Sequence, residues 1–221
     1  MLTVAVLNQK GGVGKSTLAT NIAAAAHLSG RRTILLDLDT QGNAFDWYNA
    51  RREGSRLEGL TVARADKALD LRKFRELSKG FDVAVCDGPA RLGDITRAAA
   101  VAADVVVIPL RPGFFDWWAS AETIDLMDSA DMIRTELNRQ PVRRLFVING
   151  ATKNTIIARQ AHNAIAGAGG EVLPEPVTNR KAYGTVTEHG ESVFTAGNDG
   201  EAIAEMTRLW EAIIAPSMVA Q

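Results

Sequence analysis

The feature that most constrains this chain is a glycine-rich segment, residues 8–17, which reads Asn-Gln-Lys-Gly-Gly-Val-Gly-Lys-Ser-Thr. It follows an apolar run that predicts a strand and precedes a helical pattern that begins near Lys15. Glycines let backbone N–H groups surround an anion, and a helix N-terminus adds its dipole and its unpaired N–H groups. The segment therefore predicts a phosphate-binding loop made of Lys10, Gly11, Gly12, Val13, Gly14, Lys15, Ser16 and Thr17.

Two side chains of this loop stand where a P-loop needs them. Lys15 can reach the β- and γ-phosphates, and the Ser16 hydroxyl can ligate Mg²⁺, so ATP and Mg²⁺ are the expected ligands. The loop departs from the usual G-x-x-x-x-G-K-[ST] pattern because Gln9 replaces the first glycine and Lys10 precedes a bunched group of glycines. This form is the deviant Walker A motif. Two nearby lysines repel each other unless an anion lies between them, so we expect Lys10 to contact a phosphate held by another subunit.

Length and composition are those of one α/β domain, which we expect to span residues 1–221, with a hydrophobic fraction of 46%. The 25 basic and 26 acidic residues nearly cancel, but residues 134–181 hold eight Lys/Arg against three Asp/Glu. That excess predicts a basic face. The single cysteine, Cys86, excludes an intramolecular disulfide framework and a cysteine-ligated cluster. The start of the chain enters a strand directly and no apolar run approaches 18 residues, so we expect a cytoplasmic protein without a membrane span.

Short apolar runs alternate with helical patterns along the chain. This alternation predicts the P-loop NTPase fold, a mostly parallel twisted sheet with helices on both faces. The expected strands are Thr3–Leu7, Thr33–Leu36, Val83–Cys86, Val105–Ile108, Leu145–Ile148 and 171–173. The expected helices are at about 15–29, 67–79, 92–102, 117–137, 155–167 and 200–214.

Acidic residues follow two of the expected strands. Asp39 comes just after the second strand and Asp87 ends the third, in the sequence Val-Cys-Asp-Gly-Pro. Ligands of parallel sheets bind at the carboxyl ends of the strands, where both carboxylates would meet the phosphate loop. Asp87 is therefore expected to hold Mg²⁺ in the Walker B manner, directly or through water, and Asp39 to orient the attacking water or to reach Mg²⁺ through water.

Four segments together resemble the ParA family of partitioning ATPases. They are N-Q-K-G-G-V-G-K-S-T at 8–17, L-L-D-L-D-T-Q-G-N at 35–43, F-D-V-A-V-C-D-G-P at 81–89 and E-H-G-E-S-V-F at 188–194. The resemblance covers essentially the whole chain and is to the small subtype that lacks an N-terminal helix-turn-helix. It departs from many members at Thr40, where they have proline.

The resemblance implies a role for each matching residue. Lys15 and Ser16 would bind phosphate and Mg²⁺, Lys10 would cross the interface of an ATP-sandwich homodimer, and Asp39 would activate the hydrolytic water. Asp87 would be the Walker B acid. The implied activity is slow ATP hydrolysis to ADP and phosphate, stimulated by a ParB-like centromere-binding protein.

The resemblance also implies contacts outside the phosphate loop. Asn149, at the end of the fifth expected strand, stands where the family contacts adenine. Arg180 and Lys181 fall in the region of its DNA-contacting residues. ATP-bound dimers of the family coat double-stranded DNA without sequence preference. The expected location is therefore the nucleoid, and the cargo is a plasmid, a chromosome or another body.

Other functions on the same scaffold are open alternatives. A membrane-associated regulator of the Min type needs a basic amphipathic C-terminal helix, whereas residues 201–221 hold three Glu and one Arg. We therefore expect no stable membrane association. A metabolic ligase would need a substrate-binding constellation of its own, and the sequence offers none. A positioning ATPase for a cargo other than DNA remains a further alternative.

Overall fold

The computed structural model describes the whole chain except residues 66–69, 92, 113–120, 153–169, 197 and 217–221. Its elements, in chain order, are β1 (Leu2–Val6), α1 (Lys15–Leu28), β2 (Thr33–Asp37), α2 (Asn43–Asn49), β3 (Thr61–Arg64), α3 (Leu71–Leu77), β4 (Val83–Asp87), α4 (Asp94–Ala102), β5 (Val105–Leu110), α6 (Ala121–Glu136), β6 (Arg143–Ala151), β7 (Glu171–Val172), β8 (Val177–Thr178), α8 (Lys181–Thr187) and α9 (Gly200–Ile214).

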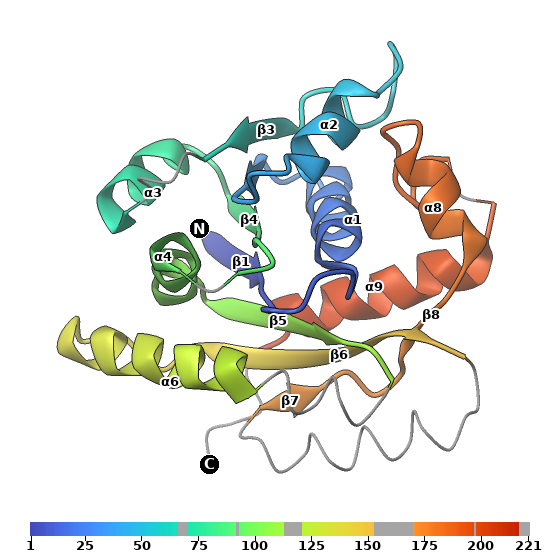
Figure 1. Cartoon of the computed structure of the whole chain (residues 1–221). Helices are drawn as coiled ribbons and strands as arrows, with labels where there is room; N and C mark the ends of the chain where they lie inside the picture. Colours follow the sequence, from blue (N-terminus) through green and yellow to red (C-terminus); the bar gives the residue numbers. More distant parts are fainter. Residues whose placement is uncertain (66–69, 92, 113–120, 153–169, 197, 217–221) are drawn as a thin grey trace.

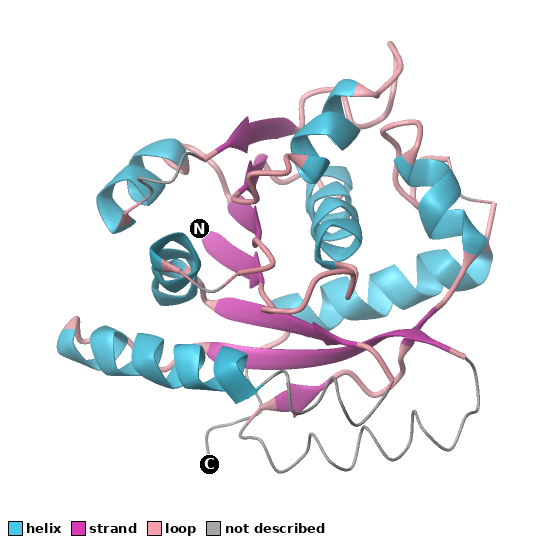
Figure 2. Ribbon diagram, in the orientation of Figure 1, coloured by secondary structure: helices cyan, strands magenta, loops and turns pink. Residues whose placement is uncertain are grey.

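The strands form one sheet in the order β3-β2-β4-β1-β5-β6-β7, and β8 pairs with the far end of β6. Every described pairing is parallel. Because parallel neighbours need crossover connections, helices cover both faces of the sheet. In Figures 1 and 2, α1 and α9 lie on one face, and α3, α4 and α6 lie on the other.

Alternation along the buried strands builds two apolar layers. In β4, Val83 and Val85 face the layer that contains α1 and α9, whereas Ala84 and Cys86 face the layer that contains α4 and α6. Successive residues of a strand point to opposite faces, so a strand buried on both faces must be apolar throughout. This explains why the strands read as unbroken runs of Val, Ile, Leu and Ala in the sequence.

The predicted fold class is confirmed, and the strand and helix predictions are close to the observed elements. The bounds of α9 agree with the predicted helix, and α1 ends one residue before the predicted bound, with Gly30 beyond its end at a positive φ of 82°. Strand β6 is longer than predicted because polar residues extend both of its ends. The predicted helix at 155–167 lies outside the described residues. The sequence did not predict α2, β3, β8 and α8, because these elements are short or mixed in polarity.

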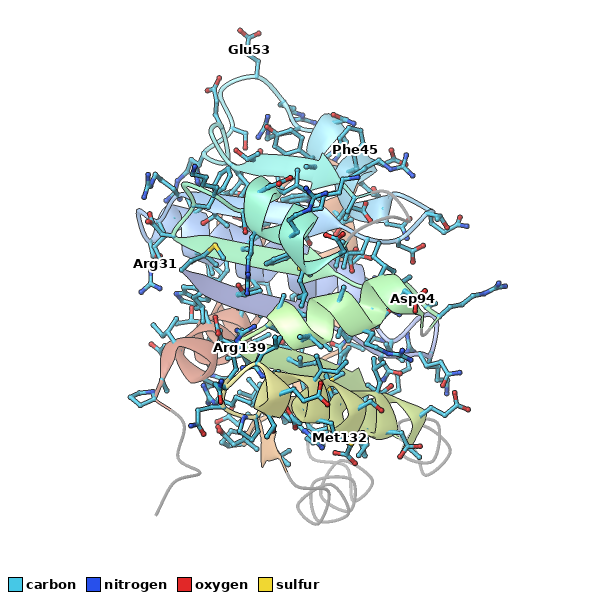
Figure 3. The ribbon with its side chains drawn as sticks, turned by 90° about the vertical axis from the view of Figure 1, so that its left-hand side faces the viewer. Arg31, Phe45, Glu53, Asp94, Met132 and Arg139 are labelled. Carbon is cyan, nitrogen blue, oxygen red and sulfur yellow. The ribbon has the colours of Figure 1, made fainter. Side chains whose placement is uncertain are left out.

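The parallel arrangement gives the sheet two edges of different character. We call the carboxyl edge the set of strand ends that contains the loop 8–15, Asp37 and Asp87, and the amino edge the opposite ends, where β5 and β6 begin at Val105 and Arg143. Figure 3 places Arg31 and Arg139 toward the amino edge and Asp94, which begins α4, toward the carboxyl edge. All of the loop residues predicted to bind phosphate therefore lie at one edge.

Candidate functional site

The glycine-rich segment forms a closed loop between β1 and α1. The Asn8 side chain accepts a hydrogen bond from the backbone N–H of Lys10 at 2.9 Å, and it donates one to the carbonyl of Pro109 on β5. Gly12 and Gly14 have φ values of 72° and 91°, which L side chains rarely adopt. The loop therefore needs these glycines for its path, in addition to the room that they leave for an anion.

Lys15 is held inside this loop. Its side chain is buried, and its Nζ atom donates a hydrogen bond to the carbonyl of Lys10 at 3.0 Å. Burial lowers the pKa of Lys15, while the nearby carboxylates of Asp87 and Asp39 raise it. The Lys15 ammonium group therefore lies inside the loop, near two carboxylates, where it can bind an incoming phosphate.

Asp87 is a buried carboxyl group without its expected partners. The residue has no exposed surface, and neither carboxylate oxygen has a hydrogen-bond partner in the described part of the chain. The pKa of Asp87 is raised to about 7, mainly because the carboxyl group is buried; the nearby carboxylates of Asp37 and Asp39 also raise this pKa, whereas the Ser16 hydroxyl and Lys15 oppose the rise. An unsatisfied buried carboxylate costs free energy, so its presence points to a ligand that satisfies it.

Two more carboxylates lie beside Asp87. Asp37 is paired with Asp87 in the register of β2 and β4, and it accepts hydrogen bonds from the backbone N–H groups of Asp39 and Phe45 at 3.0 and 2.9 Å. Burial raises the pKa of Asp37. Asp39 accepts a bond from the N–H of Gln41 at 3.0 Å and borders a hollow of about 890 Å³, so water can reach its carboxylate.

This arrangement fits a Mg²⁺ ion that arrives with phosphate. The described residues contain no group of three or more His, Cys, Asp or Glu side chains arranged to hold a metal by themselves. Mg²⁺ usually takes only one or two protein ligands and completes its octahedron with waters and phosphate oxygens. Asp87 and Ser16 are the residues that could supply those ligands here.

Asn149 lies against the phosphate loop. Its Nδ2 atom donates a hydrogen bond to the carbonyl of Val13 at 2.7 Å. A Cβ atom on Gly14 would fall 2.1 Å from the same nitrogen, so this contact is a second reason for glycine at that position. The predicted adenine contact of Asn149 stays a prediction.

Arg111, which was not predicted from the sequence, also contacts the loop. It follows the last residue of β5, and its Nε atom donates a hydrogen bond to the carbonyl of Gly12 at 3.0 Å. The signal that could have found it is a basic residue directly after an apolar strand that lies next to β1 in the sheet.

Arg180 lies away from the phosphate loop, in a cluster of carboxylates. Its side chain, 14% exposed, pairs with Glu205, Glu201 and Asp199. Glu205 is itself buried, and it also accepts bonds from the hydroxyls of Thr178 and Tyr183. The guanidinium charge is therefore compensated within the fold, which weighs against the predicted DNA contact, whereas Lys181 is exposed.

The basic excess of residues 134–181 has a structural use that the sequence did not reveal. Arg134 and Arg139 donate to carbonyls at the C-terminal end of α4, and Arg143 donates to three carbonyls at the end of α9. Cations are stabilised there by the negative end of the helix dipole. Arg144 pairs with Asp128 and Asp131. The expectation of a basic face built from this segment is therefore wrong for these four arginines.

A parallel sheet with a phosphate loop after β1 and carboxylates after β2 and β4 defines a P-loop NTPase. The family model for the CobQ/CobB/MinD/ParA nucleotide binding domain matches residues 4–193. The chain belongs to this family, and the predicted resemblance to ParA is confirmed. None of the described helices is long and apolar enough to cross a membrane.

Relatives of the chain include partitioning and positioning proteins. It is 30% identical to the maintenance of carboxysome distribution protein A of Halothiobacillus neapolitanus, over 92% of this chain and 91% of that one. It is 29% identical to the chromosome-partitioning ATPase Soj of Thermus thermophilus, over 91% and 87%. The ATP complex of McdA from Cyanothece has the same fold, with a TM-score of 0.77, 15% identity and coverage of 100% and 99%.

Proposed function

We propose that this chain is an ATPase that binds Mg²⁺-ATP at the carboxyl edge and hydrolyses it to ADP and phosphate. The observation that carries the proposal is the buried Asp87, whose oxygens lack partners among the described residues and lie beside a preformed phosphate loop. In this assignment the backbone N–H groups of residues 11–16 surround the phosphates, and Lys15 leaves the Lys10 carbonyl to bind them. Asp87 and Ser16 hold Mg²⁺, which neutralises charge on the phosphates when it is bound.

Asp39 is the residue proposed to position the attacking water. It borders the open hollow, so a water molecule has access to its carboxylate, whereas Asp37 and Asp87 are buried. Asp39→Ala should leave Mg²⁺-ATP binding within a few-fold of wild type and reduce single-turnover hydrolysis about 100-fold or more. Equal hydrolysis by the variant and the wild type would overturn this role.

We also propose that ATP drives dimerisation, with Lys10 contacting a phosphate held by the second subunit. The bunched glycines bring two lysines into one loop, and the family resemblance gives Lys10 this role. Sedimentation of Asp39→Ala with ATP should reveal a stable dimer, and the double variant with Lys10→Ala should bind ATP as a monomer. A monomeric Asp39→Ala protein at micromolar concentration with ATP would contradict the sandwich dimer.

The biological work proposed for this ATPase is partitioning or positioning of a cargo on the nucleoid. The support is the sequence relation to proteins named for chromosome partitioning and for carboxysome distribution. In this proposal the ATP dimer binds double-stranded DNA without sequence preference, and a ParB-like protein stimulates hydrolysis and release. A relative named for carboxysomes, similar over nearly all of both chains, favours a second candidate in which the cargo is a protein body rather than DNA.

The DNA contact proposed for this dimer centres on Lys181 rather than Arg180. Lys181 is exposed at the start of α8, whereas Arg180 is already paired with acidic residues. Lys181→Glu should weaken binding to two unrelated duplexes by similar factors in the ATP state and reduce the salt dependence. Gel shifts with ATP, ADP and no nucleotide test this. Equal binding in all three states would contradict the nucleotide switch.

The membrane-regulator alternative is disfavoured by the packing of α9. The apolar side chains of this helix that are buried in the core, in the same cluster as residues of α1 and the sheet, are Ala202, Met206, Leu209, Trp210 and Ile213. A helix whose apolar face is used inside the fold cannot also insert that face into lipid. Flotation with anionic vesicles tests this, and ATP-dependent flotation without DNA binding would favour the membrane alternative.

A further inference from the structure

Two successive carbonyl groups of the phosphate loop are bound by side chains from outside the loop. Arg111 donates from Nε to the carbonyl of Gly12 at 3.0 Å, and Asn149 donates from Nδ2 to the carbonyl of Val13 at 2.7 Å. The two donors come from neighbouring strands, because Leu110 of β5 lies opposite Ile148 of β6 in the parallel register. Two neighbouring strand ends therefore present side-chain donors to two successive carbonyl groups of the loop.

These contacts bear on how the loop is prepared for an anion. A phosphate cradle needs its backbone N–H groups directed inward, and a carbonyl that turned inward would repel the phosphate. The loop contains three glycines, of which Gly12 and Gly14 have positive φ values, and glycine has many alternative conformations of similar energy. A donor that holds a carbonyl outward removes some of those alternatives before the ligand binds.

We propose that Arg111 is a positioning residue whose Nε–H holds the Gly12 carbonyl outward and so preorganises the phosphate loop. The proposal rests on the proposed function only for the identity of the ligand. Arg111 acts through the backbone of Gly12, and this role requires no contact between its guanidinium group and a phosphate. Preorganisation reduces the ordering cost of binding, so it favours every nucleotide that uses the loop, whatever the number of its phosphates.

Two substitutions of Arg111 distinguish the effect of its hydrogen bond from the effect of its side-chain length. Arg111→Gln keeps an N–H donor at the same number of bonds from the backbone as Nε, and Arg111→Met keeps the length without any donor. Arg72→Met on α3, where the arginine side chain is 83% exposed, is a control for loss of a surface arginine. Thermal denaturation of all three variants tests whether each is folded, and we expect cooperative unfolding in every case.

The first measurement is amide hydrogen exchange of residues 10–16 in the protein without nucleotide. Arg111→Met should raise exchange in this loop about five- to tenfold, while Arg111→Gln and Arg72→Met should match the wild type. Unchanged exchange in Arg111→Met would overturn the proposal. Because this measurement uses no nucleotide, its outcome does not depend on ATP binding, and a wild type that failed to bind ATP would reject the proposed function instead.

The second measurement is the association rate of fluorescent ADP and ATP analogues. Arg111→Met should slow both by the same factor, about five- to tenfold, and Arg111→Gln should restore both rates. If Arg111→Met and Arg111→Gln both slowed the association of ATP but not of ADP, the guanidinium charge would contact the γ-phosphate directly. That result would overturn the positioning role.

Discussion

The amino and carboxyl edges of the sheet both carry buried charges, and they differ in whether those charges have partners. At the amino edge, Arg143 forms a two-pronged pair with Glu171, with both N–O distances at 2.6 Å, and also binds the end of α9. Arg134 is buried against carbonyls of α4. At the carboxyl edge, Asp87 is fully buried and its oxygens have no partner among the described residues.

This difference separates stability from binding. A buried charge with good partners holds elements together, whereas a buried charge without them destabilises the fold and is retained where a ligand supplies the missing partner. The arginines of the amino edge join helix ends to strand starts. The carboxylates of the carboxyl edge would instead meet Mg²⁺ and the cations of the loop. Substitutions at the two edges should therefore change stability in opposite directions.

The largest expected effect is a gain of stability in Asp87→Asn. Because the folded pKa of Asp87 is about 7 and its unfolded value is 3.8, the unfolded chain releases this proton first as pH rises. The carboxylate therefore lowers stability progressively between about pH 4 and pH 7. Without nucleotide, the variant should be more stable by up to about 4 kcal/mol at pH 8 and by less than half of that at pH 5. Urea denaturation at both pH values measures this.

A pH-independent difference, or a loss of stability at pH 8, would contradict this picture of Asp87. The same variant should lose the Mg²⁺-dependent part of its nucleotide affinity, because an amide is a poorer ligand for a hard cation than a carboxylate.

At the amino edge, substitution of a buried charge is expected to lower stability rather than raise it. Arg143→Met removes the partner of Glu171 and leaves three carbonyls at the end of α9 without their donor. The free energy of unfolding should fall by about 3 kcal/mol, and nucleotide affinity should be unchanged. Arg143→Lys is the matched control, since it keeps the charge but loses the planar fork, and it should fall in between. If Arg143→Met were as stable as the wild type, the amino edge would not stabilise the fold, and the contrast between the two edges would be wrong.

A second buried carboxylate, Glu205, sharpens the contrast. Unlike Asp87, it accepts hydrogen bonds from Thr178, Arg180 and Tyr183. Glu205→Gln makes the same chemical change as Asp87→Asn, but it should destabilise the protein by about 2 kcal/mol, because it removes a charge that already has partners. Chemical denaturation of the two amide variants side by side gives the comparison. A gain in stability for both variants would show that hydrogen-bond partners do not decide whether a buried carboxylate stabilises or destabilises the fold.

The smallest effect is expected for an ion pair on the surface. Arg72 and Glu76 are 3.9 Å apart on α3, with 83% and 66% of their side chains exposed. Arg72→Ala should change the free energy of unfolding by less than about 0.5 kcal/mol, since such pairs are screened by solvent and salt. A loss as large as that of Arg143→Met would mean that burial and helix ends are not what distinguishes the amino edge.

Much of the carboxyl edge could be predicted from the sequence because its signals are local. The loop of residues 8–17 carries its glycines, lysines and hydroxyl in one continuous segment, and Asp87 directly ends an apolar strand. Strands buried on both faces also read clearly as apolar runs. These features need no knowledge of which segments meet in space.

The contacts that the sequence did not predict join segments far apart in the chain. Arg111 meets Gly12 across 99 positions, and Arg143 meets the end of α9 across about 70. The net charge of a segment does not distinguish an arginine on the surface from one that caps a helix. The basic excess of residues 134–181 therefore led to the wrong expectation of a basic face. Strand β3 was missed because its residues are half-buried or exposed at the edge of the sheet.

The most direct test of the central claim is calorimetric titration of Mg²⁺-ATP into the wild type and Lys15→Gln. Lys15 is the buried ammonium group that the carboxyl edge holds ready for phosphate. We predict one ATP bound per wild-type chain and an affinity at least about 100-fold weaker in Lys15→Gln, because the variant lacks the charge that balances the β- and γ-phosphates. Equal affinity of the two proteins, or no binding of ATP by the wild type, would contradict the assignment of the carboxyl edge as an ATP site.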